Sequence, residues 1–238
     1  KKDIQAFNPD VLVLIDYPGF NLNIAPWAKK NGYKIAYYIS PQVWAWKEGR
    51  VKKMKTCIDH LMAILPFEKD YFLNRWNWEI EYVGHPLLEA IDQAQQQPPT
   101  PIPATQPIVA LLPGSRKQEI SQKLPIMLGV SKQFTNYQFV VAKAPGLPDT
   151  FYKIWQEQYP NVLFVTGKTY DLLRQSQAAL VTSGTATLET ALLQIPQVVC
   201  YKGSAISYEI GKRVVKIKYI SLVNLILDWP LVEELIQY

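Results

Sequence analysis

The sequence is poor in the residues from which many metal and redox sites are built, with two cysteines and two histidines among 238 residues. Cys57 and Cys200 lie far apart and belong to no zinc-type spacing, which argues against a disulfide scaffold and a structural zinc site. We expect both thiols to be buried and reduced, as in a cytoplasmic protein. The sequence predicts neither a metal ion nor another cofactor.

Long hydrophobic runs are also missing. No apolar stretch approaches the roughly 20 residues of a membrane-spanning helix, and no signal peptide is visible. The sequence has no P-loop and no G-x-G-x-x-G fingerprint, which disfavours an ATPase or a dinucleotide enzyme. It also has no basic groove-reading helix and no aromatic RNA platform motif, so nucleic acid is not an expected partner.

The composition suits a folded α/β protein. Hydrophobic residues make up 48% of the chain and charged residues 19%, and the formal net charge is +5. This mild excess of positive charge favours anionic partners without choosing among them. Short apolar runs alternate with helical segments, which is typical of parallel βα units. The expected strands span residues 10–16, 34–40, 60–66, 80–84, 108–114, 137–145, 161–167, 178–184 and 196–201.

The chain divides at a segment rich in proline. Residues 93–107 contain five prolines and no apolar periodicity, which suits a semi-rigid linker. We expect an N-terminal domain over 1–97, a linker over 98–107 and a second domain over 108–238, with a cleft between the domains. The run at 10–16 is apolar on both faces, as buried parallel strands are. The first sheet has few strands, and the chain both starts and stops inside helix-like sequence. We therefore expect a truncated first domain and a second domain that lacks its C-terminal part.

Two strand ends in the second domain carry residues suited to an anion. In LLPGSRKQEI (111–120), Gly114 lets the backbone approach a ligand, Ser115 offers a hydroxyl and Arg116 a cationic fork. This combination suits a diphosphate. The alternative is an ordinary βα turn in which Arg116 pairs with a surface acid.

The second strand end is LVTSGTATLETAL (180–192). Ser183, Gly184 and Thr185 stand where a strand gives way to a helix, whose free N–H groups and dipole attract anions. Thr187 offers a further hydroxyl, and Glu189 could reach the hydroxyls of a ribose. The alternative is that these residues only cap the helix and that Glu189 complements its dipole. Two such turns in one domain favour a nucleoside diphosphate.

Two features of the first domain suggest acceptor chemistry and a membrane. Asp16 ends an apolar strand and could act as a general base, although an N-cap or turn role remains open. Aromatic and apolar residues directly precede a basic cluster, an arrangement suited to the boundary of an anionic membrane. The alternatives are stacking on nucleobases and burial in the core. The residues concerned are Val43, Trp44, Trp46, Arg50, Lys52 and Lys53.

Seven blocks in order resemble the lipid-A-disaccharide synthase family of bacterial glycosyltransferases (family 19). They are IDYPGFNLNIA (15–25), YYISPQVWAWKEGRVKKM (37–54), ILPFEKDYF (64–72), YVGHPL (82–87), LLPGSRKQEI (111–120), LVTSGTATLETAL (180–192) and KRVVKIKYISLVNLI (212–226). The resemblance implies a GT-B architecture, two Rossmann-like domains facing a cleft, and catalysis without a metal. It also places Asn224 near the donor.

The resemblance further implies a reaction and a location. A UDP-linked 2,3-diacylglucosamine donor and a 2,3-diacylglucosamine 1-phosphate acceptor would give a β-1,6-linked lipid A disaccharide 1-phosphate and UDP, with inversion. The enzyme would lie on the cytoplasmic face of the inner membrane, and a homodimer is allowed. Family members often read DAPDFN where this chain reads DYPGFN, so Gly19 replaces an acid that could be the base instead of Asp16. Other readings are another UDP-sugar transferase or epimerase, or an inert nucleotide-binding or membrane-binding fragment.

Overall fold

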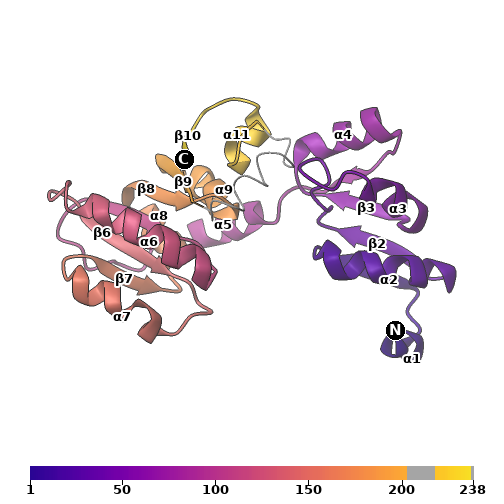
Figure 1. Ribbon diagram of the computed structural model, residues 1–238, viewed down its shortest axis with the longest axis horizontal. Coiled ribbons are helices and arrows are strands. Elements are labelled where there is room, and N and C mark those ends of the chain that lie inside the picture. The colour runs from indigo at the N-terminus through magenta and orange to yellow at the C-terminus, as the bar shows by residue number, and fades with distance from the viewer. Residues whose placement is uncertain (203–217, 237–238) are drawn as a thin grey trace. The chain divides into compact units, whose positions relative to one another are not determined.

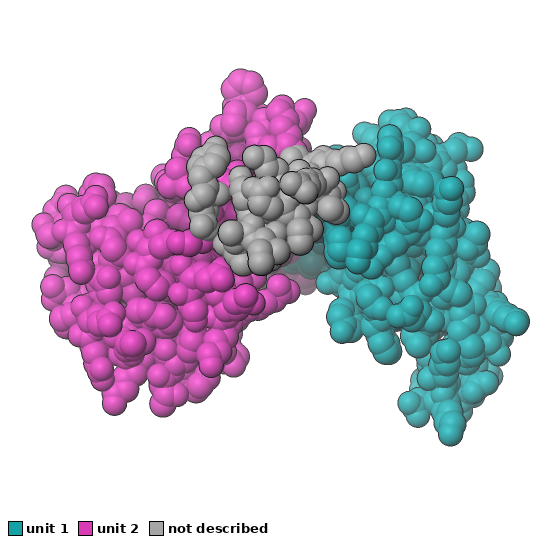
Figure 2. Space-filling model, viewed as in Figure 1, with its two compact units in different colours: residues 1–86, 212–216 teal, residues 87–211, 217–238 magenta. Residues whose placement is uncertain are grey.

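The computed structural model describes residues 1–202 and 218–236. The chain forms two compact units, and each is described by itself (Figure 2). Unit 1 contains Lys1–Pro86 and unit 2 begins at Leu87. The last block of the family resemblance begins at residue 212, so its first six residues lie outside the described part.

Unit 1 is a parallel sheet in the order β1-β2-β3-β4 (Figure 1). Each strand is followed by a helix, except that unit 1 ends after β4. A short helix α1 precedes the sheet. The elements are α1 (Lys2–Phe7), β1 (Val11–Ile15), α2 (Pro18–Lys30), β2 (Lys34–Tyr38), α3 (Arg50–Cys57), β3 (His60–Ala63), α4 (Pro66–Trp76) and β4 (Glu81–Tyr82).

Unit 2 is a six-stranded parallel sheet in the order β10-β9-β8-β5-β6-β7. Its elements are α5 (Leu87–Gln95), β5 (Ile108–Leu112), α6 (Lys117–Ser131), β6 (Gln138–Lys143), α7 (Asp149–Gln158), β7 (Leu163–Thr166), α8 (Thr169–Arg174), β8 (Ser176–Thr182), α9 (Thr185–Leu192), β9 (Gln197–Tyr201), α11 (Leu222–Leu227) and β10 (Glu233–Ile236). From β5 the chain first runs outward through β6 and β7, and then returns to the other side of β5 at β8. The strand order therefore reverses between β5 and β8.

Alternating side chains of unit 2 bury two apolar layers, one on each face of the sheet. Ala110 and Leu112 of β5 belong to the layer that includes Leu172 of α8, whereas Leu111 packs with residues of α6 and α7. A sheet covered by helices on both faces needs strands that are apolar on both faces, and this explains the unbroken apolar runs in the sequence.

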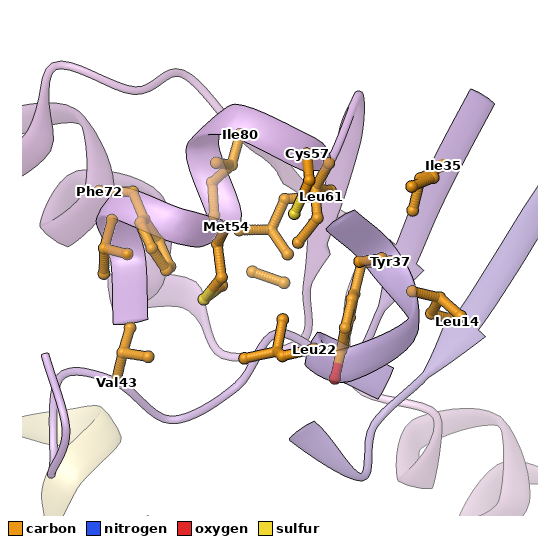
Figure 3. Packing of buried hydrophobic residues seen from close by; sticks show 14 of the residues in the cluster. Leu14, Leu22, Ile35, Tyr37, Val43, Met54, Cys57, Leu61, Phe72 and Ile80 are labelled. Atoms are coloured by element: carbon orange, nitrogen blue, oxygen red, sulfur yellow. The ribbon is translucent and has the colours of Figure 1, made fainter. Parts of the chain in front are cut away.

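The core of unit 1 lies between its helices and one face of its sheet (Figure 3). Tyr37, Met54 and Phe72 are fully buried in it. The strand β1 differs from the prediction of two buried faces. Leu14 is 6% exposed, but Val11, Val13 and Ile15 are 46%, 54% and 58% exposed. Since β1 is the edge strand, and only alternate residues face the core, one apolar face stays open.

Two further expectations need correction. The first domain was expected to extend to residue 97, but α5 belongs to unit 2: Ile91 is buried in its core, and Arg174 Nη1 donates to the carbonyls of Ala94 and Gln97 at 2.8 Å. The division between the units thus falls at Leu87, before the prolines. Of the two free thiols, Cys57 is buried as expected, while Cys200 is partly exposed.

Candidate functional site

The topology of unit 2 predicts where a ligand binds. In an open parallel sheet, ligands occupy the carboxyl ends of the strands where the strand order reverses. Here that point lies between β5 and β8, whose following turns are Gly114–Arg116 and Ser183–Thr185. A pocket of about 420 Å³ lies at this place, and both turns line it.

The turn after β5 needs glycine. Gly114 has φ +113°, and a Cβ atom there would stand 2.9 Å from Glu119 Oε2 and 3.6 Å from Thr182 Cγ2. A side chain would therefore be strained and would fill the space into which a ligand could press against the backbone. Ser115 and Arg116 follow as exposed residues at the start of α6.

Arg116 pairs with a surface acid, as in the alternative considered for it, and it also lines the pocket. Its side chain is 83% exposed and lines the pocket, and its Nη1 lies 3.5 Å from Glu119 Oε1. An exposed pair of this kind is weak, so the guanidinium can turn to an anionic ligand at little cost. The arrangement suits recognition of a phosphate by a planar pair of N–H donors.

The turn after β8 also needs glycine. Gly184 has φ +147° and ψ −162°, a region that only glycine occupies readily. The helix α9 starts at Thr185, which is exposed, and no side chain caps its first N–H groups. Thr187 N donates to the Gly184 carbonyl at 3.2 Å, but among the described residues the N–H groups of Thr185 and Ala186 have no partner, and the positive end of the helix dipole lies behind them.

Two hydroxyl groups near this turn donate hydrogen bonds to backbone carbonyls. Ser183 Oγ donates to the carbonyl of Ile220 at 2.7 Å, yet Ser183 still lines the pocket. Thr187 is fully buried, and its Oγ1 donates to the carbonyl of Gly184 at 2.8 Å. The prediction that Thr187 contacts a diphosphate is therefore wrong, because its hydroxyl closes the first turn of α9 instead.

Glu189 stands at the far side of the pocket. It is held by Tyr170, whose hydroxyl donates to Glu189 Oε1 at 3.0 Å. Burial, reinforced by this carboxylate, raises the pKa of Tyr170 to about 12, so Tyr170 stays a donor at neutral pH. Within residues 1–202 and 218–236, no hydrogen bond occupies the other carboxylate oxygen of Glu189, which could accept from a ligand hydroxyl.

Several residues that line the pocket were not predicted from the sequence, among them Lys143, Thr182 and Glu119. Lys143, at the end of β6, is 9% exposed and lies 2.7 Å from Asp149 Oδ1. It adds a second cation beside Arg116. Thr182 ends β8, and its Oγ1 is buried without a hydrogen-bond partner among the described residues, which is unusual for a native polar atom. Glu119 shapes the floor under Gly114. In the sequence, the only feature that could have identified Lys143 and Thr182 as pocket residues is their position at the ends of strands.

Asn224 does not line this pocket. It is 1% exposed, and its amide holds the start of β10: Nδ2 donates to Val232 O and Glu234 Oε1 at 2.9 Å, while Oδ1 accepts from Val232 N at 3.0 Å. All its polar atoms are satisfied within the fold. The structure therefore contradicts the expected donor contact: Asn224 stands inside α11, and its amide joins this helix to β10.

In unit 1, Asp16 lies at the carboxyl end of β1, in a turn of unusual geometry. Asp16 and Tyr17 both have φ +43°, which is rare for residues other than glycine. Tyr37 Oη and Asn21 Nδ2 donate to the Asp16 carbonyl at 2.6 and 2.7 Å and hold this turn. The Asp16 side chain is exposed. Backbone strain held in place by buried donors is typical of functional positions.

The predicted membrane residues separate into two groups. Val43 is 1% exposed and belongs to the core of unit 1 (Figure 3), so its assignment to a membrane surface is wrong. Trp44 is half-buried, with its Nε1 donating to Glu68 Oε1 at 3.1 Å. Trp46 is 44% exposed and carries Lys47 and Arg50 over its ring, at 4.3 and 5.4 Å from the centroid. Lys52 and Lys53 are exposed on α3.

Two findings concern what the described residues do not contain. Within residues 1–202 and 218–236, no helix is long and apolar enough to cross a membrane. The same part of the chain holds no group of three or more His, Cys, Asp or Glu side chains arranged for a metal ion.

The two parallel-sheet units, the second with glycine turns at its switch point, define an α/β protein of the GT-B type. Solved structures agree on the fold. A UDP-GlcNAc 2-epimerase from Neisseria meningitidis matches with a TM-score of 0.56 and 15% identity, over 95% of this chain and 69% of that one. An MnaA–UDP structure from S. aureus matches with a TM-score of 0.62 and 10% identity, over 95% and 68% of the two chains.

Comparison of sequences identifies a specific family within this fold class. The chain belongs to the lipid-A-disaccharide synthetase family, whose model matches residues 1–238. It is 42% identical over 247 residues to a lipid-A-disaccharide synthase of Syntrophus aciditrophicus and 39% identical over 248 residues to lipid-A-disaccharide synthase 1 of Legionella pneumophila (strain Lens). In both matches the whole chain is covered, and it spans 64% of the relative's length.

Proposed function

We propose that this chain is part of an inverting glycosyltransferase that joins a UDP-2,3-diacylglucosamine donor to a 2,3-diacylglucosamine 1-phosphate acceptor. The products are lipid A disaccharide 1-phosphate and UDP. Membership of the lipid-A-disaccharide synthetase family supports this reaction. The observation that carries it in the structure is the pocket where the Gly114 and Gly184 turns meet.

In this proposal, unit 2 binds the donor. The diphosphate lies between the backbone of Gly114 and the N-terminus of α9 at Thr185, with Ser115 and Ser183 as further donors. Arg116 and Lys143 supply positive charge, and Glu189 accepts from the ribose hydroxyls. All of these residues line one pocket, which supports their acting together.

The chemical step is a direct displacement. The acceptor's 6-hydroxyl loses its proton to Asp16 as its oxygen bonds to the anomeric carbon of the donor, and the bond from that carbon to UDP breaks. Negative charge then grows on the departing diphosphate. Arg116 and the free N–H groups of α9 stabilise it without needing a metal ion. Gly19 is exposed, and nothing lies within 4 Å of a Cβ atom placed there, so the structure leaves room for the acid that other family members carry.

The exposed basic surface of unit 1 supports peripheral binding to an anionic membrane, at the cytoplasmic face of the inner membrane. Lys47 and Arg50 lie over the Trp46 ring, and Lys52 and Lys53 are exposed on α3. An aromatic ring with nearby cations suits the headgroup boundary. Acylated substrates would be reached from this surface.

Substitution of Arg116 tests the proposed chemistry. In the full-length enzyme, Arg116→Ala should lower kcat by about 10²–10³-fold, since one donor to developing negative charge is lost. The assay follows disaccharide formation from both acylated substrates in detergent micelles. Lys153→Ala is the matched control, because Lys153 is exposed on α7 and pairs only with Glu157 at 3.8 Å. Equal activity of the two variants would contradict the proposal.

A further inference from the structure

A second pocket of unit 2 differs in character from the first. It measures about 230 Å³ and lies between α6 and the edge formed by β9 and β10. Ile126 and Met127 of α6 form one wall, and Cys200 and Leu235 belong to the strands opposite. No residue lining it belongs to the Gly114 pocket. Its surface is largely apolar, and its charged lining residues are Lys123 and Lys202.

Lys123 is the buried one of these two lysines, at 5% exposed. Within residues 1–202 and 218–236, its ammonium has neither a hydrogen bond nor an ion pair. The face of the Tyr201 ring lies near it, 5.7 Å from Nζ to the centroid. Buried lysines are almost always paired, because an unpaired buried charge is costly. Glu119 lies one turn earlier but is turned to Arg116, at 3.5 Å.

The energetics of Lys123 point the same way. Burial lowers the pKa of Lys123, and the nearby Glu119 carboxylate and Cys200 thiol oppose this shift without cancelling it. A bound anion would reverse this by pairing with Nζ. Lys202, also on the pocket wall, adds a second positive charge.

We propose that this pocket binds a small amphiphilic carboxylate, with its carboxylate on Lys123 Nζ and its hydrocarbon chain against Ile126, Met127 and Leu235. The size fits, because an apolar cavity of about 150 Å³ is enough for benzene. A single buried ammonium matches one carboxylate, whereas a phosphate dianion needs several donors. A neutral lipid would leave the ammonium unpaired.

Octanoate is the probe, and octanol is its uncharged counterpart. Titrated into this chain and followed by calorimetry, octanoate should bind at least about tenfold more tightly than octanol. Lys123→Met should abolish this preference, while Lys132→Met, just after α6, should leave it intact. Equal binding of both probes to the unsubstituted chain, or an unchanged preference in Lys123→Met, would overturn the proposal.

A second measurement needs no substitution. The chain has three methionines, and only Met127 lines the pocket. In a spectrum of ¹³C-methyl methionine, octanoate should move the Met127 signal and leave those of Met54 and Met62, both in unit 1, in place. A Met127 signal that does not move at saturating octanoate, or one that moves equally with inorganic phosphate, refutes carboxylate binding here.

Discussion

At the scale of single residues, Glu68 is the most unusual acid of unit 1. It is 1% exposed at the start of α4, and it accepts from Leu65 N at 3.0 Å and from Trp44 Nε1 at 3.1 Å. Burial raises the pKa of Glu68 from 4.5 to about 7, although these donors oppose the shift. Glu68 thus connects α4 to the segment that carries Trp44 through a hydrogen bond, and its contribution to stability depends on pH.

The sign of this dependence follows from proton uptake. Between about pH 4.5 and 7, the folded chain keeps a proton on Glu68 that the unfolded chain has lost. The Glu68 contribution to the unfolding free energy therefore falls as pH rises through this range, by up to about 3 kcal/mol, and is constant above it.

Glu68→Gln isolates this contribution. The difference in unfolding free energy between the unsubstituted chain and Glu68→Gln should decrease from pH 5 to pH 7 and then level off. Urea unfolding followed by tryptophan fluorescence suits unit 1, which holds five of the seven tryptophans. Glu79→Gln, at an exposed position of the same unit, is the control. A difference that rises with pH, or one that Glu79→Gln reproduces, would contradict the assignment.

At the scale of elements, the proposed diphosphate site depends on the strand-to-helix turn after β5. Gly114→Ala should weaken UDP binding about tenfold and lower the unfolding free energy by about 1–3 kcal/mol, because φ +113° and the close Glu119 side chain both oppose a Cβ atom. Calorimetry with UDP and urea unfolding measure the two effects.

Gly129→Ala in α6 is the matched control. Nothing lies within 4 Å of a Cβ atom at Gly129, which stands inside a helix. Its replacement by alanine should leave UDP binding unchanged and stabilise the chain by about 0.5–1 kcal/mol. If both variants bind UDP equally well, the Gly114 turn does not contact the diphosphate.

The elements themselves were largely predictable. Each expected strand is present, because a buried parallel strand must be apolar along its length and the sequence shows this directly. The strand β10 was missed, since its sequence EELI is half acidic and its Glu234 accepts hydrogen bonds from Ile220 N and Ser221 N. The open face of β1 was missed because an apolar run does not indicate whether one face or both are covered.

The candidate site, too, could be predicted only in part from the sequence. Glycine turns and exposed cations have local signatures, so Gly114, Arg116 and Gly184 could be proposed from sequence. Lys143 and Thr182 enter the pocket only through the strand order, which brings β6 and β8 beside β5. Whether a hydroxyl is free also depends on its neighbours, and for this reason Thr187 was misassigned.

At the scale of the whole molecule, membrane binding should depend on Trp46 and not on Trp44. Trp46→Ser removes an exposed ring and should weaken binding to vesicles containing phosphatidylglycerol roughly tenfold, with the melting temperature unchanged. Trp44→Ser removes the donor to Glu68 and the edge contact with Phe67, at 5.0 Å between centroids, and should lower the melting temperature instead. Vesicle sedimentation and thermal unfolding separate the two. If Trp46→Ser and Trp44→Ser lost vesicle binding equally and lowered the melting temperature equally, both rings would be core residues and the prediction would be wrong.

The central claim is that the pocket between the Gly114 and Gly184 turns of unit 2 binds the diphosphate of UDP. A crystal structure of this chain with UDP tests it most directly. We predict density for both phosphates between the Gly114 turn and the first N–H groups of α9, with Arg116 in contact and the ribose beside Glu189. UDP bound elsewhere on the chain, with this pocket empty, would contradict the account.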